Sequence, residues 1–241
     1  MNEKVSIVLV RTTHPGNIGA VARAMRVMGL HRLVLVDPRC RVGSVARARA
    51  SGAVDVLDHA RVVESIDEAI AEAGFVVGTS ARKRSLGPQV CALRSGMAEC
   101  MREQERGEVA ILFGPERNGL DNAALERCNR LWYIPTAQDY ASLNLSAAVQ
   151  VVASELFAAG ADAPPGDKPP AVASAGEVAG LITHFEEVAR AVNFVDADAP
   201  RQAFHRVERL FHRARLEPAE VKLLRGFLTA VERRKRQSNE R

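Results

Sequence analysis

A chain of 241 residues with 47% hydrophobic and 26% charged residues is long enough to bury a core and has the composition of an ordinary globular protein. This composition excludes a largely disordered or collagen-like chain, and no apolar run is long enough to cross a bilayer. The formal net charge of +4 is modest, so any strongly basic surface has to be local.

The four cysteines are widely spaced, at positions 40, 91, 100 and 128. They form no CxxC pair and have no histidine at a metal-ligand spacing, so we expect free thiols and no bound metal. The N-terminal MNEK leads directly into a short apolar run, with no signal-peptide pattern. These features predict a cytoplasmic protein that does not enter a membrane.

The first part of the chain alternates short apolar runs with helical patterns. Runs rich in β-branched residues predict buried parallel strands at Val5–Val10, Leu33–Val36, Phe75–Gly78, Val109–Phe113 and Leu131–Ile134. Helical spacing predicts helices at Ile18–Met28, Ile66–Ala73, Leu120–Cys128 and about Leu143–Ala158. The alternation predicts an α/β fold with a parallel sheet. The last of these helices is apolar on most of its circumference, as expected for a helix in a core or at an interface.

The segment Gly160–Gly176 contains four prolines and no apolar period, which predicts a linker. Beyond it, apolar residues at helical spacing predict three amphipathic helices, with Pro218 in the first turn of the last. We therefore divide the chain into an α/β domain at 1–160, a linker at 161–176 and a helical domain at 177–241.

Positive charge is concentrated in the C-terminal segment. Residues 201–241 contain 12 Lys and Arg against 5 Asp and Glu, a net charge of +7, so the first 200 residues are slightly acidic. Arg206, Arg209 and Arg213 recur at i, i+3 and i+7, whereas another helix face carries Phe204, Val207, Leu210 and Phe211. The clustering favours contact with a nucleic acid over a merely solvated helix surface.

Glycines and polar residues follow three of the predicted strands, at the sheet edge where open α/β folds bind ligands. HPGNIGAVARAMR places Asn17 and Arg23 in the spacing N-x-G-x-x-x-R, which is not the G-x-G-x-x-G of a dinucleotide site. FGPERNGL contains Glu116, and IPTAQDYASLNLSA contains Ser142 and Asn144, with Ser142 as a plausible N-cap. Taken singly, each segment also fits an ordinary helix start.

Taken together, NIGAVARAM, FGPERNGL and SLNLSAAVQ resemble, in order and spacing, the three motifs of the SpoU branch of the SPOUT RNA methyltransferases. The segment RLFHRARLEPAEVKLLRGFL extends the resemblance to the TrmJ-type tRNA 2′-O-methyltransferases, so that only the linker is left out. The resemblance implies a parallel sheet with a C-terminal trefoil knot, S-adenosylmethionine as cofactor, and a homodimer formed through the helix at Leu143–Ala158. It also implies tRNA as substrate, at the pyrimidine nucleotide of anticodon-loop position 32.

The resemblance also implies site residues. Cofactor contacts fall at Thr79, Ser80, Ala81, Gly114, Ile134, Ser142, Leu143 and Asn144. Arg23 corresponds to the arginine at the reacting 2′-hydroxyl. Because a free guanidinium has a pKa above about 12, we expect it to position the adjacent phosphate and stabilise the alkoxide, with the proton acceptor left open. Asn17 then orients Arg23 or the ribose, Glu116 holds Arg23 through a charge-assisted hydrogen bond, and Ser142 and Asn144 line the boundary between cofactor and substrate. No metal is implied.

Two other functions remain open. A ribosomal RNA methyltransferase of the same class would share the core motifs, although such enzymes more often carry an N-terminal RNA-binding extension, and the extra domain here is C-terminal. A non-catalytic RNA-binding SPOUT protein would keep the fold without the chemistry, but all five polar motif positions are present.

Overall fold

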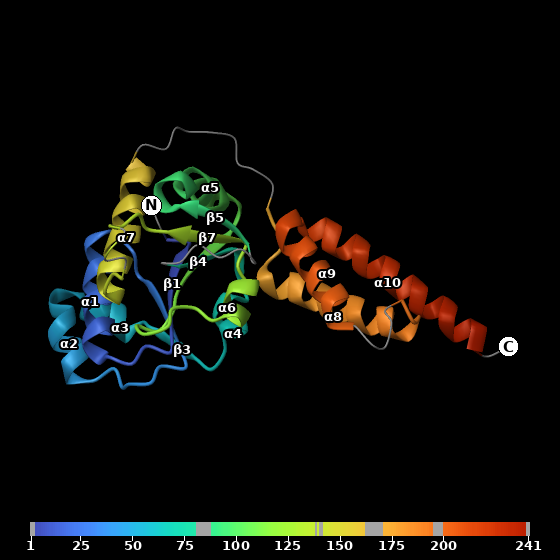
Figure 1. The fold of residues 1–241 in the computed structure, drawn as a ribbon, viewed down its shortest axis with the longest axis horizontal. Coiled ribbons are helices and arrows are strands. Elements are labelled where there is room, and N and C mark those ends of the chain that lie inside the picture. The colour runs from blue at the N-terminus through green and yellow to red at the C-terminus, as the bar shows by residue number, and fades with distance from the viewer. Residues whose placement is uncertain are drawn as a thin grey trace.

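The computed structural model describes residues 3–80, 88–137, 139, 142–161, 171–194 and 200–239. Its centre is a sheet of seven strands in the order β3-β2-β1-β6-β4-β7-β5, in which every neighbouring pair is parallel (Figure 1). The strands are β1 Val5–Val10, β2 Arg32–Val36, β3 Arg61–Val63, β4 Ala73–Thr79, β5 Gln89–Ala92, β6 Glu108–Phe113 and β7 Arg130–Tyr133. The predicted α/β fold with a parallel sheet is confirmed.

Helices cover both faces of the sheet, which explains why the central strands are apolar throughout. In β1, Val5, Ile7 and Leu9 face one core and Val8 and Val10 face the other. The first core contains residues of α1 Pro15–Val27, α2 Ser44–Ala50, α3 Val54–Asp58, α5 Leu93–Arg106 and α7 Leu145–Ala161. The second contains residues of α4 Ile66–Ile70 and α6 Asn122–Glu126. A short 3-10 helix, Ser51–Ala53, joins α2 to α3.

The five predicted strands are confirmed, with ends that agree to within two residues. Two strands, β3 and β5, were not predicted, because they have only three and four residues and no fully buried run. The helices α2, α3 and α5 were not predicted either. The last of these is strongly charged, and only a narrow stripe that includes Leu93, Met97 and Cys100 is buried.

Three C-terminal helices follow, as predicted: α8 Ala175–Ala191, α9 Pro200–Ala214 and α10 Pro218–Asn239. They pack around a small core of their own that includes Val178, Leu181, Val221 and Leu228. Ser174 and Glu177 form a capping box at the start of α8. The apolar face predicted for α9 is only partly covered, since Phe204 is 7% exposed whereas Leu210 is 49% exposed. Among the described residues, no helix is long and apolar enough to cross a membrane.

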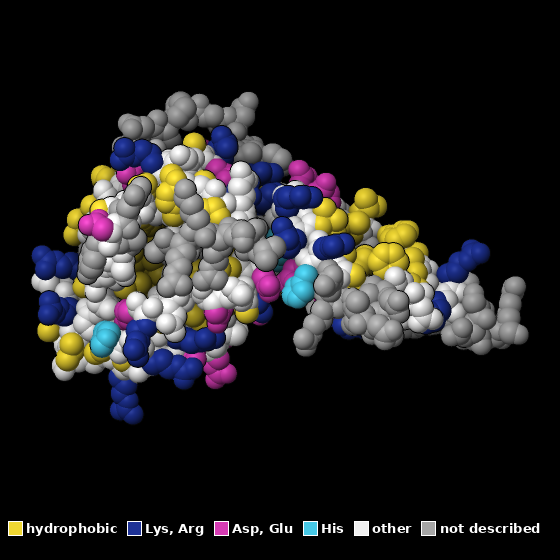
Figure 2. All heavy atoms as spheres, viewed as in Figure 1, with side chains coloured by type: hydrophobic (Ala, Val, Ile, Leu, Met, Phe, Trp, Pro, Cys, Tyr) yellow, Lys and Arg dark blue, Asp and Glu magenta, His cyan; other side chains and the backbone are white. Residues whose placement is uncertain are grey.

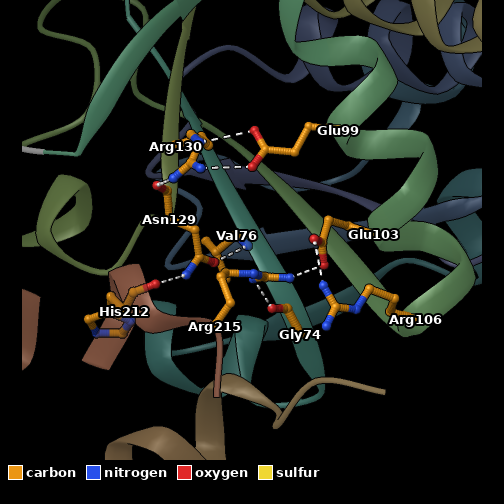
Figure 3. Close-up of polar contacts among 9 residues, drawn as sticks. All are labelled: Gly74, Val76, Glu99, Glu103, Arg106, Asn129, Arg130, His212 and Arg215. Atoms are coloured by element: carbon orange, nitrogen blue, oxygen red, sulfur yellow. Dashed lines mark hydrogen bonds and ion pairs between the residues drawn. The ribbon is translucent and has the colours of Figure 1, made fainter. Parts of the chain in front are cut away.

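Polar contacts join the C-terminal helices to the sheet (Figure 3). The side-chain oxygen of Asn129 accepts a hydrogen bond from the amide of Val76 at 2.7 Å, and its side-chain nitrogen donates to the carbonyl of His212 at 2.9 Å. Arg215 donates to the carbonyl of Gly74 and to the carboxylate of Glu103. The C-terminal helices are therefore attached at β4 and α5, and in Figure 1 they extend away from the sheet.

Candidate active site

A cavity of about 410 Å³ opens at the carboxyl ends of β4, β6 and β7, which are neighbours in the sheet. This is the position at which parallel α/β sheets bind ligands. The cavity is lined by residues from the three segments that follow these strands: Thr79, Ser80, Phe113, Gly114, Pro115, Glu116, Arg117, Asn118, Gly119, Leu120, Trp132, Ile134, Thr136, Ser142, Leu143, Leu145 and Ala148.

The loop after β6 is closed on itself by two glycines. A Cβ atom at Gly114 would lie 2.2 Å from both the carbonyl carbon of Gly119 and the amide nitrogen of Leu120, so no larger residue fits. Gly119 has a φ of +67°, a left-handed conformation that glycine adopts without strain. Gly114 lines the cavity, as expected of a residue at the cofactor, but the loop itself already requires a glycine there.

A chain of hydrogen bonds links the segments that follow β1, β6 and β7. The side-chain nitrogen of Asn144 donates to the side-chain oxygen of Asn17 at 3.2 Å, and the side-chain nitrogen of Asn17 donates to Glu116 at 2.9 Å. The amide and hydroxyl of Thr13 and the amide of His14 also donate to Glu116, at 3.2, 3.0 and 3.3 Å. Three residues far apart in the chain, at positions 17, 116 and 144, are thereby held together.

Glu116 is a fixed negative charge in this network. Burial raises the pKa of its carboxyl group, but hydrogen bonds from Asn17, its own backbone and Thr13 outweigh burial and hold the pKa below its usual value. Both carboxylate oxygens already accept hydrogen bonds. A carboxylate in this state orients its donors and is a poor acceptor for a further proton.

Asn144 caps α7, a role that the sequence analysis gave to Ser142. The helix begins at Leu145, two residues later than predicted, and the side-chain oxygen of Asn144 accepts hydrogen bonds from the amide and hydroxyl of Ser146 at 2.9 and 2.7 Å. An asparagine at this position satisfies a free amide of the first helical turn. Ser142 instead lines the cavity.

Within one chain Arg23 does not contact Glu116, which accepts hydrogen bonds from other donors, so the hydrogen bond expected between them is not formed inside the chain. Arg23 is exposed in the middle of α1, where it does not line the cavity and its side chain makes no hydrogen bond or ion pair with any residue of the described ranges. Glu116 is occupied by Thr13, His14 and Asn17, whose donors lie at the very start of α1 and just before it. Arg23 follows Asn17 by six residues, so nearly two helical turns of α1 separate Arg23 from the donors that contact Glu116.

Gly19 in the first motif has a packing role. A Cβ there would lie 2.0 Å from the carbonyl oxygen of Ala46, because α2 crosses α1 at that point. The motif N-x-G-x-x-x-R therefore combines a polar contact at Asn17, a helix crossing at Gly19 and an exposed cation at Arg23.

Most of the residues expected at the cofactor surround the cavity: Thr79, Ser80, Gly114, Ile134, Ser142 and Leu143. Asn144 is not among the lining residues and lies beside them in the hydrogen-bonded network. Ala81 falls outside the described residues. Two contributions were not predicted from the sequence: Trp132, whose place in an apolar strand indicated burial, and Thr13, a hydrogen-bond partner of Glu116.

Cys40 is half-buried near this site, and its Sγ lies 3.5 Å from the carbonyl oxygen of Thr12. Burial, followed by the charge of Glu116, raises the pKa of its thiol, so it is protonated at neutral pH. Within the described ranges, no group of three or more His, Cys, Asp or Glu side chains is arranged to bind a metal.

Comparison with known families divides the chain at the same place as its architecture. The SpoU rRNA Methylase family matches residues 4–154, and the family described as the tRNA methyltransferase TrmJ C-terminal domain matches residues 176–240. The first match spans the sheet and its helices, including every segment that lines the cavity. The second spans α8, α9 and α10.

Relatives match the chain along nearly its full length. A tRNA (cytidine/uridine-2′-O-)-methyltransferase TrmJ from Cronobacter sakazakii is 40% identical over 96% of this chain and 97% of its own. A tRNA (cytidine/uridine/adenosine-2′-O-)-methyltransferase TrmJ from Pseudomonas aeruginosa is 39% identical over 97% and 95%. The crystal structure of TrmJ from Z. mobilis ZM4 superposes with a TM-score of 0.82 at 31% identity, over 94% of this chain and 98% of that one. The chain belongs to the SpoU methylase family, in the TrmJ-type group that carries the additional C-terminal domain.

Proposed function

We propose that this protein is an S-adenosylmethionine-dependent tRNA 2′-O-methyltransferase that acts on the pyrimidine nucleotide at anticodon-loop position 32. The observation that carries the proposal is the cavity at the ends of β4, β6 and β7, beside which Asn17, Glu116 and Asn144 are hydrogen-bonded together. The TrmJ relatives, which match both the sheet and the C-terminal helices, support tRNA as the substrate.

The cavity suits S-adenosylmethionine in size and chemistry. Its volume of about 410 Å³ falls in the range of small-molecule sites. Trp132, Ile134 and Leu143 provide apolar surface for an adenine ring, whereas Thr79 and Ser80 provide hydroxyl groups. The bound cofactor would supply the methyl group as the electrophile.

Glu116 does not take the proton of the ribose hydroxyl in this mechanism, because its lowered pKa and its four hydrogen bonds make it a weak base. Its role is to fix Asn17, which in turn orients the substrate ribose. Ser142 and Asn144 form the adjoining edge between cofactor and substrate. Arg23 positions the neighbouring phosphate and stabilises the developing alkoxide by its charge.

A homodimer would bring Arg23 to an active site. Arg23 is exposed on α1 and does not line the cavity of its own chain, which supports a role at the cavity of a second copy. The helices α1 and α7 pack side by side. Each carries a large exposed apolar side chain near its C-terminal end: Val27 of α1 is 64% exposed and Phe157 of α7 is 51% exposed. Apolar surface of this kind is typical of an interface between subunits.

The C-terminal helices provide a further surface for tRNA. Arg206, Arg209 and Arg213 are exposed on α9, and Figure 2 shows Lys and Arg side chains gathered over the C-terminal helices near the sheet. Exposed arginines of this kind bind phosphates and give salt-dependent affinity. We also propose that the segment from β4 to α7 forms the trefoil knot of the family, since the loops after β4, β6 and β7 all converge on one cavity.

The reaction is tested with purified full-length protein, labelled S-adenosylmethionine and tRNA transcripts, followed by nucleoside mass spectrometry. The expected product is 2′-O-methylcytidine or 2′-O-methyluridine at position 32, and transcripts methylated elsewhere would contradict the assignment. Ribosomal RNA fragments are the parallel substrate, because methylation of those alone would support the ribosomal alternative. Binding of RNA without any methyl transfer would identify a non-catalytic protein.

The proposed sharing of the site between subunits is tested by mixing two inactive variants. Arg23→Ala should lower methyl transfer at least a hundredfold while binding of S-adenosylmethionine changes less than about threefold. Ser142→Trp should block the cavity. If Arg23 acts at the cavity of the partner, co-refolded mixtures of the two variants regain part of the wild-type activity. Mixtures as inactive as each variant alone would place Arg23 at its own cavity.

A further inference from the structure

A run of arginines beside α1 forms an exposed, positively charged surface outside the cavity. Residues 39–49 contain four arginines and no Asp or Glu, although the first 200 residues are slightly acidic as a whole. The four residues, Arg39, Arg41, Arg47 and Arg49, are exposed in the loop before α2 and on α2 itself. Figure 2 shows Lys and Arg side chains at the left-hand end of the molecule, where Figure 1 places α1 and α2.

Acidic neighbours neutralise two of the four. A guanidinium nitrogen of Arg39 lies 2.6 Å from a carboxylate oxygen of Asp37, and one of Arg47 lies 2.5 Å from a carboxylate oxygen of Asp58. The side chains of Arg41 and Arg49, in contrast, make no hydrogen bond or ion pair with any residue that the structure describes. These two guanidinium groups carry positive charge that no described carboxylate balances.

Arg49 lies against the first two turns of α1. A Cβ at Gly16 would lie 3.8 Å from Cγ of Arg49, and a Cβ at Gly19 would lie 2.9 Å from its Cβ. Because the two glycines have no side chains, the aliphatic part of Arg49 packs directly on the helix backbone. This packing places Arg49 at the end of α1 that also carries Asn17, the partner of Glu116.

Arg23 lies on the same side of α1, because it follows Gly16 by seven residues, or two helical turns. The rise between them is about 10 Å. Arg23 and Arg49 are thus two exposed cations on one side of this helix, at its middle and at its start. Exposed guanidinium groups without carboxylate partners are suited to the phosphates of a nucleic-acid backbone.

We propose that Arg41 and Arg49 form a second phosphate-binding surface, which holds the substrate RNA on the side of the active site opposite to its C-terminal contacts. This inference rests on the proposed function, since it needs an RNA substrate. Residues 39–50 contain no aromatic residue, and the anchors of protein–protein interfaces are typically aromatic. Charge without such an anchor favours a phosphate backbone over a protein partner.

The test compares full-length wild-type protein with Arg41→Gln/Arg49→Gln, a variant that leaves all proposed catalytic residues in place. The matched control is Arg102→Gln, because its side chain is also exposed without a described partner but lies on α5, which follows β5, the edge strand at the end of the sheet opposite to β3. The tRNA dissociation constant is measured by filter binding at several salt concentrations. Methyl transfer kinetics and cofactor affinity are measured in parallel.

The double variant should bind tRNA about tenfold more weakly. The slope of log affinity for tRNA against log salt concentration should become shallower. The change should be about 0.7 to 0.9 for each phosphate that the two arginines neutralise in the wild-type complex. The KM of the double variant for tRNA should rise to match, whereas kcat and cofactor affinity stay within about twofold. The control should match wild-type protein.

If the double variant has the same tRNA affinity and the same salt dependence as wild-type protein, this inference is overturned. The proposed function still holds in that case, provided that wild-type protein methylates tRNA. A changed sedimentation coefficient with unchanged tRNA binding would also overturn this inference, in favour of a contact between proteins. If wild-type protein methylates no RNA, the proposed function fails, and the binding comparison with the control still decides whether this surface contacts RNA.

Discussion

The guanidinium group of Arg215 is bound to the carboxylate of Glu103, 112 residues away in the chain, and lies 4.6 Å from the centre of the Phe75 ring. Arg215 also donates to the carbonyl of Gly74. Burial is the main influence on its pKa and lowers it, while Glu103 acts in the opposite direction. This arginine follows α9 and fastens the C-terminal helices to the sheet (Figure 3).

Replacing Arg215 by Met should detach the C-terminal helices. Removing one partner of a buried ion pair costs about 3 kcal/mol or more, because the other charge stays buried. The effect should be seen as an early helical transition in thermal unfolding by circular dichroism, before the transition reported by Trp132 fluorescence. The control Arg47→Met, which breaks an exposed pair with Asp58, should cost less than about 1 kcal/mol. Arg215→Met/Glu103→Met should be more stable than Arg215→Met, and an equal or lower stability would contradict the role of the pair.

Two substitutions at Asn144 should separate its two contacts. Asn144→Ala removes both the cap of α7 and the hydrogen bond to Asn17, so it should cost about 1 kcal/mol of stability and also slow methyl transfer. Asn144→Ser keeps a capping oxygen but does not reach Asn17, so it should restore most of the stability and none of the rate. Denaturant unfolding and single-turnover assays measure the two effects. Equal rates for Asn144→Ser and wild-type protein would show that the contact with Asn17 has no catalytic role.

Glu208 should make stability depend on pH. Burial, followed by the charge of Glu126, raises the pKa of Glu208. A raised carboxyl pKa means that the folded protein disfavours the charged form. The resulting loss of folding stability is absent below the pKa of the unfolded protein and complete above the raised pKa of the folded protein. Glu208→Gln should therefore raise the melting temperature at pH 7.5, and the difference from wild-type protein should vanish near pH 4. A stabilisation that persists at pH 4 would show that charge is not the cause.

The cysteines should differ in reactivity. Burial raises the pKa values of Cys100 and Cys128 to about 12, so both thiols stay protonated and shielded at pH 8. Cys40 and Cys91 are only half-buried. Alkylation with iodoacetamide followed by peptide mass spectrometry should therefore label Cys40 and Cys91 first, and Cys100 and Cys128 only after denaturation. Rapid labelling of Cys128 in the native protein would contradict its position in the second core.

The strongly apolar strands were predictable because burial on both faces leaves a continuous hydrophobic run, as in Val5–Val10 and Val109–Phe113. The segments around the cavity were predictable because glycines and polar side chains at strand ends are conspicuous. The partners within the site were not. Glu116 was expected at Arg23, but it binds Thr13 and Asn17, and only the fold determines which donors come within hydrogen-bond distance.

The basic C-terminal segment shows the same limit. Arg206, Arg209 and Arg213 are exposed as their helical spacing predicted. Arg215 counted equally toward the positive charge of this segment, yet it is buried against Glu103 and contributes little to a surface that could attract RNA. Charge counted along a sequence does not distinguish a free cation from one that is neutralised by a carboxylate 112 residues away.

The order of the strands has a consequence for synthesis on the ribosome. β1 is the first strand to emerge, but one of its two neighbours in the sheet is β6, which begins at Glu108. The cavity needs segments as late as Ala148, so no shorter nascent chain contains a complete site. One edge of β1 therefore stays unpaired while roughly a hundred further residues are translated, which takes about 5 to 20 s at about 5 to 20 residues per second. During that interval the growing chain exposes an unpaired apolar strand edge, which favours aggregation until β6 is available to pair with it.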